Sequence, residues 1–201
     1  ENAAGYLSSK NHSEGEDLRQ LADWCADATW ALDIATGAGH TAGAVLDAGV
    51  TNVIGFDAAP EMVATSLDAY PGVRGVVGDA ERLPFTQRSL DAVTCRIAAH
   101  HFPSPESFVA EVSRVVKPGG VFALEDNVAP DDPDLDSFLN EFEASRDPTH
   151  VKSYQLGTWR EWLEDHGFTI EETVRLSRII EFTPWVDRIS ALTEADKESV
   201  R

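Results

Sequence analysis

The chain has 201 residues, of which 42% are hydrophobic, and these values suit one globular domain with a substantial core. It carries 35 acidic residues against 16 Lys and Arg, and the formal net charge of −19 argues against a nucleic-acid partner, because it repels phosphate backbones. No apolar run approaches the roughly 20 residues that span a bilayer, and no basic-then-apolar segment indicates secretion.

Cysteine and lysine usage predict where such a protein works. Two isolated cysteines, Cys25 and Cys95, suit neither a disulfide scaffold nor a zinc site, so the prediction is a reducing cytoplasm and no metal. Lysine is rare, and an acidic, lysine-poor surface stays hydrated when salt screens its charges. This pattern predicts a halophilic protein, with an acidic mesophilic enzyme as the alternative.

The first half of the chain alternates predicted helices and strands. Leu18, Leu21, Ala22 and Cys25 recur at helical spacing and predict a helix over 16–26. The segments that follow in order are a strand at 31–35, a helix at 40–48, a strand at 53–57, a helix from Pro60, strands at 73–77 and 90–96, a helix at 108–116 and a strand at 121–125. This alternation predicts crossover units and a parallel sheet.

The second half predicts a different arrangement. Apolar periodicity predicts a helix over 135–146, and Thr158 with Glu161 forms a capping-box pattern for a helix to His166. Alternating residues predict two antiparallel strands around Arg175, followed by a helix. The expected organisation is a single domain over 1–201, with a cofactor-binding core at 16–128, a substrate cap at 129–166 and a terminal hairpin at 168–182.

A glycine turn after the first strand is the most informative segment for function. Thr36-Gly37-Ala38-Gly39 allows a tight turn and close approach to a ligand, and the helix from His40 points its free N–H groups toward that turn. Asp57 lies 20 residues after Gly37, at the spacing where an acid accepts hydrogen bonds from a ribose. Asp57 also suits capping of the next helix.

The remaining charges discriminate between nucleotide-like ligands. Asp79, followed by the small Ala80, suits an adenine amine and ring. No Lys or Arg lies in the first turn to receive a pyrophosphate, whereas Asp33 at the end of the first strand suits a cationic ligand such as a sulfonium. Pairing of Asp33 inside the fold is an equally open alternative.

Five segments, in this order and spacing, resemble the motifs of one enzyme family: ALDIATGAGHTA, GFDAAPEMV, GDAERLPF, SLDAVTCRIAAHHF and VVKPGG. They are similar to class I S-adenosylmethionine-dependent methyltransferases of the ubiquinone/menaquinone-biosynthesis type (methyltransferase domain 11-like). The resemblance covers residues 16–128. It implies an α/β, Rossmann-like, seven-stranded and mostly parallel sheet, with a C-terminal antiparallel strand and helices on both faces.

The resemblance also implies roles for individual residues. The cofactor S-adenosyl-L-methionine, with S-adenosyl-L-homocysteine as product, would contact the following residues: Asp33, Ala35, Thr36, Gly37 and Gly39 near the methionine part, Asp57 at the ribose, Ala58 and Met62 at the adenosine, Asp79 and Ala80 at the adenine, and Arg96 and Ile97 along the ligand. Many relatives have Gly-Cys-Gly where this chain has Ala35-Thr36-Gly37, so Thr36 adds a hydroxyl.

The expected reaction is direct displacement of the activated methyl group onto a small-molecule acceptor. The candidate base is His101, or else His100, since imidazole titrates near neutrality. Adjacent residues of an extended segment point in opposite directions, so at least one of the two is structural. The segment 130–153 is expected to shape the acceptor pocket. The expected assembly is a monomer or homodimer. The alternatives are an NAD-dependent oxidoreductase and a non-catalytic S-adenosylmethionine-binding protein.

Overall fold

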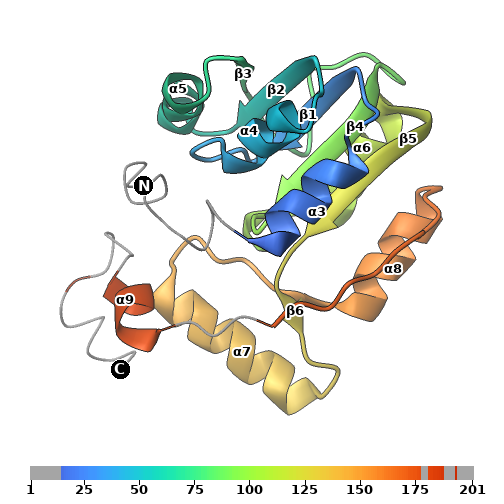
Figure 1. Ribbon diagram of the computed structural model, residues 1–201. Helices are drawn as coiled ribbons and strands as arrows, with labels where there is room; N and C mark the ends of the chain where they lie inside the picture. The colour runs from blue at the N-terminus through green and yellow to red at the C-terminus, as the bar shows by residue number, and fades with distance from the viewer. Residues whose placement is uncertain (1–14, 178–180, 188–192, 194–201) are drawn as a thin grey trace.

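The computed structural model describes residues 15–177, 181–187 and 193 (Figure 1). Its central sheet has five parallel strands in the order β3-β2-β1-β4-β5. Their bounds are β1 (Trp30–Ile34), β2 (Asn52–Asp57), β3 (Val73–Val77), β4 (Leu90–Arg96) and β5 (Val116–Glu125). The predicted α/β class with a parallel sheet is therefore confirmed.

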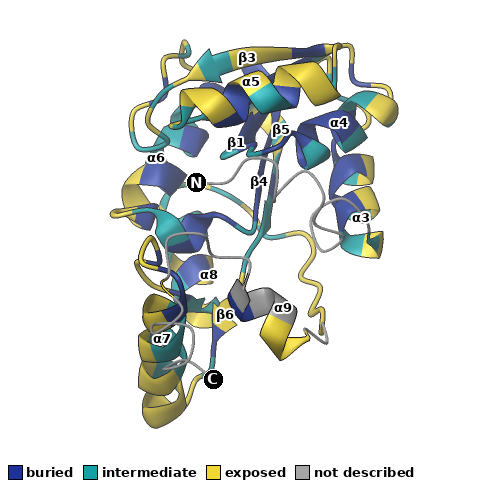
Figure 2. Ribbon diagram, turned by 90° about the vertical axis from the view of Figure 1, so that its left-hand side faces the viewer, coloured by how far each residue is buried: buried dark blue, intermediate teal, exposed yellow. Residues whose placement is uncertain are grey.

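Helices cover both faces of this sheet, as the turned view in Figure 2 shows, with α3 and α4 on one side and α6 and α8 on the other. The helices are α3 (Glu16–Trp24), α4 (His40–Asp47), α5 (Pro60–Ala69), α6 (Pro105–Val115), α7 (Pro133–Arg146), α8 (Leu156–Asp165) and α9 (Phe182–Asp187), with a 3-10 turn η1 (Ala99–His101). A separate parallel pair, β6 (Val128–Ala129) with β7 (Tyr154–Gln155), lies beside α7.

Side-chain alternation along β1 explains the three layers. Leu32 and Ile34 belong to the core cluster that also contains α6 and Trp159 of α8. Ala31 belongs to the second cluster, with α3 and α4. Successive residues of a strand point to opposite faces, so a five-residue apolar strand is buried from both sides. This is why the first strand reads as a nearly continuous apolar run.

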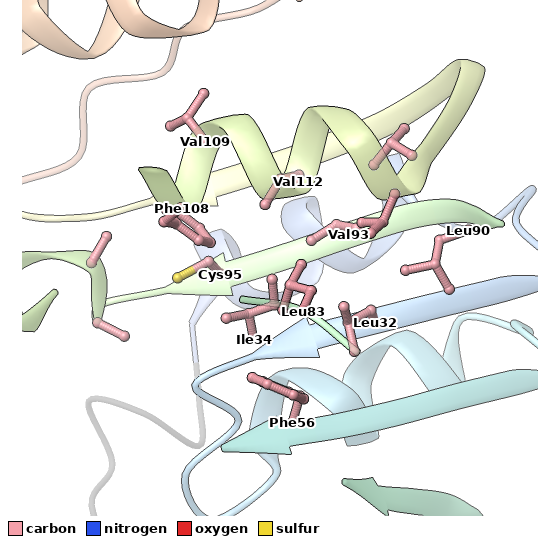
Figure 3. Packing of buried hydrophobic residues seen from close by; sticks show 14 of the residues in the cluster. Leu32, Ile34, Phe56, Leu83, Leu90, Val93, Cys95, Phe108, Val109 and Val112 are labelled. Carbon is pink, nitrogen blue, oxygen red and sulfur yellow. The ribbon is translucent and has the colours of Figure 1, made fainter. Parts of the chain in front are cut away.

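The α6 side of the sheet holds the larger side chains (Figure 3). Phe108, Val109 and Val112 of α6 are fully buried against Val93 and Cys95 of β4. Burial of each such side chain stabilises the fold by roughly 1.5–3 kcal/mol. This packing fixes the position of α6. Because α6 connects β4 to β5, the packing also fixes the end of β4 and the start of β5.

Two predictions for the second half need correction. Helix α8 begins at Leu156 and not after Thr158, and Gln155 before it makes no side-chain cap hydrogen bond, so the capping box is wrong. The start of the helix is decided by tertiary contacts. Gln155 is the last residue of β7, and the pairing of β7 with β6 fixes the chain directly before α8. Gly167, with φ 84°, follows the end of the helix as expected.

The terminal hairpin is the second correction. Residues 168–177 contain no strand, residues 178–180 lie outside the described residues, and α9 begins at Phe182. Side-chain contacts hold this segment instead of a ladder: Gln20 and Trp24 of α3 donate to Glu172, and Arg160 of α8 donates to Thr173. The expected seven strands with an antiparallel edge are therefore not confirmed. Most of the predicted helix over 183–201 also lies outside the described residues.

No helix in the part of the chain that the structure describes is long and apolar enough to cross a membrane.

Candidate active site

The sheet order reverses between β1 and β4. From β1 the chain continues toward β2 and β3, and from β4 it continues toward β5 on the opposite side. Ligands of open α/β sheets bind in the crevice at such a switch point, outside the carboxyl ends of the strands. Most of the residues predicted to bind the cofactor follow these strand ends, so the topology brings them to one edge of the sheet.

Left-handed backbone marks both sides of the switch point. Ala35 follows β1 directly with φ 55°, and Ile97 follows β4 directly with φ 52°. Both were expected along the ligand. A β-branched residue in this region is a true outlier and costs on the order of 1–3 kcal/mol. The N–H of Ile97 donates to the carbonyl of Glu125 at 2.7 Å, which helps to hold that turn in place.

The glycines of the first loop have different reasons for being glycine. Gly39 has φ 89°, and a Cβ there would lie 2.4 Å from Oγ of Ser66, so α5 needs this position to be small. Gly37 has φ 53°, yet a Cβ there would meet nothing within 4 Å. Packing therefore explains Gly39, whereas Gly37 faces open space at the carboxyl end of β1.

Asp33 organises this loop from inside the fold. Its Oδ1 accepts from Thr94 Oγ1 at 2.7 Å, and its Oδ2 accepts from Thr36 Oγ1 at 2.7 Å and from the N–H of Ala42 at 3.1 Å. Burial raises the pKa of this carboxyl to about 6, although these hydrogen bonds and the charge of Arg96 oppose the rise. Asp33 is thus held inside the fold by hydroxyl and backbone donors and not by hydrogen bonds from a basic neighbour, and the extra hydroxyl of Thr36 is one of these donors.

Asp57 joins two loops at the carboxyl end of β2. One oxygen accepts from the N–H of Gly37 at 2.9 Å, and the other accepts from the N–H of Ala59 at 2.9 Å. The second bond closes a turn before α5 and does not cap the helix, which has no side-chain cap hydrogen bond. An ionised carboxylate offers about four lone-pair positions, so two remain for further donors. The side chain is half-buried, and a ligand between these loops has access to it.

The loop after β3 brings Asp79 and Ala80 to the same edge. Asp79 is exposed and accepts from the N–H of Glu81 at 2.9 Å, while Ala80 packs against the core. The loop is anchored to α6, where Glu111 accepts from the N–H of Leu83 at 2.7 Å. Of the two residues predicted to contact adenosine, Ala58 is exposed and Met62 is buried in α5.

Arg96 lies inside an ionic cluster. Its guanidinium donates to Asp17 of α3 at 2.5 Å and to Glu125 of β5 at 2.9 Å, with the Arg96 side chain only 3% exposed. The family resemblance implies that Arg96 lies along the ligand, and the structure places its guanidinium between α3 and the ends of β4 and β5. Neither acidic partner was foreseen, because they are 79 and 29 residues away.

His100 and His101 lie in η1, with ring centroids 4.1 Å apart. His100 is buried and donates through Nδ1 to Asp126 at 2.5 Å. His101 is less buried, and its Nδ1 donates to the carbonyl of Thr149 at 3.0 Å. A third ring, His150, lies 5.6 Å from His100 and bonds to Asn140.

Sequence reasoning missed Asp126 altogether and gave His150 no partner. The signal for Asp126 was its place one residue after β5, because Asp57 and Asp79 drew attention by lying at or just after the ends of other strands. The described His, Cys, Asp and Glu residues form no group of three or more able to hold a metal ion. Both histidines and Asp126 line a cavity of about 1430 Å³ that extends along β5 to α8.

The comparisons with known proteins agree with this geometry. A family model described as a methyltransferase domain matches residues 32–124. The uncharacterized methyltransferase YcgJ of Bacillus subtilis is 40% identical over 204 residues, covering 98% of this chain and 79% of YcgJ. This chain belongs to the same methyltransferase family. It is an enzyme that depends on S-adenosylmethionine, which decides against the oxidoreductase and the non-catalytic alternatives.

Other relatives of this methyltransferase extend the comparison. A crystal structure of a Bacillus halodurans protein superposes with a TM-score of 0.86 at 38% identity, covering 92% of this chain and 83% of that one. The demethylmenaquinone methyltransferase of Chlorobaculum tepidum is 36% identical over 89 residues, 44% of this chain and 37% of that protein. The methyltransferase fold implies that S-adenosylmethionine binds, and the resemblance stated from the five motifs is confirmed.

Proposed function

We propose that the carboxyl ends of β1, β2 and β3 hold S-adenosylmethionine, and that those of β4 and β5 face the methyl acceptor. In this arrangement Ala35, Thr36 and Gly37 receive the amino-acid end of the cofactor, and Asp57 receives the ribose hydroxyls. Asp79 and Ala80 contact the adenine. The observation that carries the proposal is Asp57, whose carboxylate joins the loops after β1 and β2 and keeps lone pairs for two hydroxyl donors.

The chemistry of the site fits a cationic ligand. The first loop contains no Lys or Arg, and its open space lies at Gly37, next to the Asp57 carboxylate. Asp79 adds an exposed carboxylate in the loop after β3, where it can accept a hydrogen bond from the exocyclic amine of the adenine. Gly39 and Met62 support the loop and the helix behind it, since Gly39 packs on Ser66 and Met62 is buried.

The proposed reaction is direct displacement. The bound cofactor supplies a methyl group that is already activated by a positively charged sulfur. The protein aligns the acceptor with that methyl group and excludes water. Intramolecular reactions show that such alignment contributes strongly to the rate. Backbone fixed at Ala35 and Ile97 suits this task, because strained and well-supported turns hold their neighbours in one place.

The acceptor is a small molecule in this proposal, and residues 129–166 form its cap within a single domain. The cap contains the β6–β7 pair with α7 and α8, and several of its residues line the cavity along β5. Leu139, Leu156 and Trp159 give the cavity apolar surface, while Ser153 and Asp147 add polar groups. Such mixed lining is typical of small-molecule sites.

Substitution of Asp57 tests the cofactor site. We expect Asp57→Ala to weaken S-adenosylhomocysteine binding by more than about 100-fold, because two hydrogen bonds to a charged group are lost at roughly 1.5–3 kcal/mol each. Isothermal calorimetry measures the affinity. Asp68→Ala is the matched control, since Asp68 is an exposed carboxylate on α5 that faces neither loop. Unaltered affinity in a folded Asp57→Ala protein would remove the ribose assignment.

The charge of the protein supports a second proposal, adaptation to high salt in a reducing cytoplasm. The net charge is −19, and both cysteines are free and buried. Screening of like charges is expected to raise the unfolding temperature as KCl rises from dilute buffer to molar concentration. Equal stability at both concentrations would favour an acidic mesophilic enzyme. Sedimentation in the same buffers distinguishes a monomer from a homodimer.

A further inference from the structure

Asp126 holds His100 by two hydrogen bonds from different parts of the residue. Its Oδ2 accepts from the backbone N–H of His100 at 2.8 Å, and its Oδ1 accepts from Nδ1 of the ring at 2.5 Å. An ionised carboxylate only accepts hydrogen bonds, so Nδ1 carries the proton and Nε2 keeps a lone pair when the ring is neutral. Among the described residues Nε2 of His100 has no hydrogen-bond partner.

The loop between α7 and β7 fixes the same histidine from the other side. The N–H groups of Val151 and Lys152 donate to the carbonyl of His100 at 2.9 and 3.0 Å. His100 is therefore held from the end of β5 through Asp126 and from the cap through its carbonyl, and residues of both regions line the cavity. A residue whose backbone and ring are both fixed presents its free nitrogen in one direction, as a general base requires.

His101 and His150 lack this arrangement. The carbonyl of Thr149 accepts from Nδ1 of His101, and Asn140 accepts from Nε2–H of His150, so neither ring has a carboxylate partner. The carboxylates near these two rings, Asp126 and Asp147 for His101 and Glu143 and Asp147 for His150, act only through space. The pair of adjacent histidines is thus asymmetric, although the sequence HH shows no difference between them.

The electrostatics of the cluster follow from these contacts. Burial alone would lower the pKa of His100, but Asp126, with Glu143 and Asp147 beyond it, outweighs burial and raises the pKa above its ordinary value. Burial and the charge of His100 lower the pKa of His101, and the same two causes lower that of His150. The cluster thus places its proton on His100.

We propose that His100 is the general base of the methyl transfer, that Asp126 is its positioning residue, and that the acceptor attacks through a weakly acidic phenol- or enol-type hydroxyl. The proposal rests on the proposed function. The hydroxyl proton passes to Nε2 of His100, and the oxygen forms a bond to the methyl carbon. The bond from that carbon to sulfur breaks with its electron pair remaining on sulfur, which gives S-adenosylhomocysteine. His100 releases the proton to solvent after the transfer.

Histidine NMR of the free protein tests the dyad without any acceptor. His100→Gln and His101→Gln assign the two rings by loss of their signals. The titration midpoint of His100 is expected above 6.5 and that of His101 below it. In Asp126→Asn the His100 midpoint is expected to fall from its wild-type value, because burial is then opposed only by the charges of Glu143 and Asp147. A His100 midpoint that Asp126→Asn leaves unchanged would overturn the positioning role.

4-Nitrophenol tests the class of acceptor, since its phenolate absorbs visible light and its phenol form does not. With the protein saturated by S-adenosylhomocysteine, the bound probe is expected to ionise at lower pH than the free probe, with at least a threefold higher phenolate ratio. His100→Gln and Asp126→Asn should abolish this effect, and His101→Gln, the matched control, should preserve it. Absence of probe binding, or an effect lost with His101 instead, overturns the proposal.

Calorimetry of S-adenosylhomocysteine on the same samples separates two failures. A wild-type protein that binds S-adenosylhomocysteine but shows no nitrophenol effect would sink the dyad alone. Failure of the wild-type protein to bind S-adenosylhomocysteine would sink the cofactor site and with it the proposed function. With a turned-over phenol, kcat/KM is expected to rise with pH, at a midpoint above 6.5, because the base must be deprotonated.

Discussion

The proposed cofactor side and the proposed acceptor side of the molecule are built differently. On the cofactor side, loops after β1 and β2 are joined by backbone N–H groups that donate to Asp57. On the acceptor side, side chains from distant segments meet: Asp126 follows β5, His100 follows β4, and Thr149 and His150 belong to the cap. The first is a local construction, and the second exists only in the folded chain.

This difference teaches which side tolerates change. A site made from short loops on a parallel sheet keeps its shape as long as the sheet does. A site made from side chains on separate elements changes with each substitution, which suits a fold that serves many acceptors. We expect substitutions on the two sides to have the following effects on stability and ligand binding, from the largest to the smallest.

Arg96 is expected to show the largest effect, and on stability. Arg96→Ala removes the buried guanidinium that bonds to the partly buried carboxylates of Asp17 and Glu125, which costs about 3–5 kcal/mol of unfolding free energy. Urea denaturation measures this value. Lys117→Ala is the control, because its pair with Asp91 is largely exposed and should contribute under about 1 kcal/mol. A stable Arg96→Ala protein that has lost S-adenosylhomocysteine binding would instead make Arg96 a ligand contact.

Asp33 is expected to give stability a pH dependence. Its pKa is about 6 in the fold and lower when unfolded, so the native state binds the proton more tightly. The resulting stabilisation is present at low pH and is lost as pH rises from about 4 to 6. The unfolding free energies of wild type and Asp33→Asn are measured across this window. The difference between them should change with pH by about 2–3 kcal/mol in total.

Above pH 6 the difference between wild type and Asp33→Asn should become constant. That constant includes the cost of turning an amide N–H toward the N–H of Ala42, which donates to Asp33. A difference that stays flat from pH 4 to 6 would contradict the raised pKa.

The two loop glycines separate packing from binding. Gly39→Ala should lose about 1–3 kcal/mol of stability, because its φ is left-handed and its Cβ would clash with Ser66. Gly37→Ala carries only the left-handed cost, yet its Cβ enters the proposed ligand space and should weaken S-adenosylhomocysteine binding at least tenfold. Thermal unfolding and calorimetry measure the two effects. The reverse assignment of effects would place the ligand elsewhere.

Ala35 should show the smallest effect. Ala35→Gly relieves a left-handed alanine but adds freedom to the unfolded chain, so the unfolding free energy should stay within about 0.5 kcal/mol of wild type. Ala31→Gly in the same segment has ordinary φ and a buried methyl group, and it should cost about 1 kcal/mol or more. Equal losses at both positions would argue against strain at Ala35.

The cofactor side could largely be predicted from the sequence, because its signals are local. The succession of strands along the chain and the turn at Gly37 follow from apolar runs and glycines that lie within a few residues of each other. Asp57 follows from its spacing. The internal role of Asp33 could only be left open, because Thr94, which donates to it, is 61 residues away in sequence.

The acceptor side could not be predicted to the same extent. The sequence favoured His101 over His100, because the carboxylate that distinguishes the two rings is 26 residues from His100. The capping box at Thr158 was a correct local pattern that tertiary pairing of β7 overrode. The hairpin over 168–182 was inferred from alternation alone, and side-chain contacts to α3 and α8 hold residues 172 and 173 instead.

A crystal structure of the protein with S-adenosylhomocysteine tests the central claim most directly, since it shows both sides of the site at once. The account predicts that the ribose hydroxyls donate to Asp57, that the amino-acid end lies at Gly37, and that the sulfur faces the cavity that Nε2 of His100 borders. A ligand bound away from Asp57, or one whose sulfur faces away from His100, would contradict it.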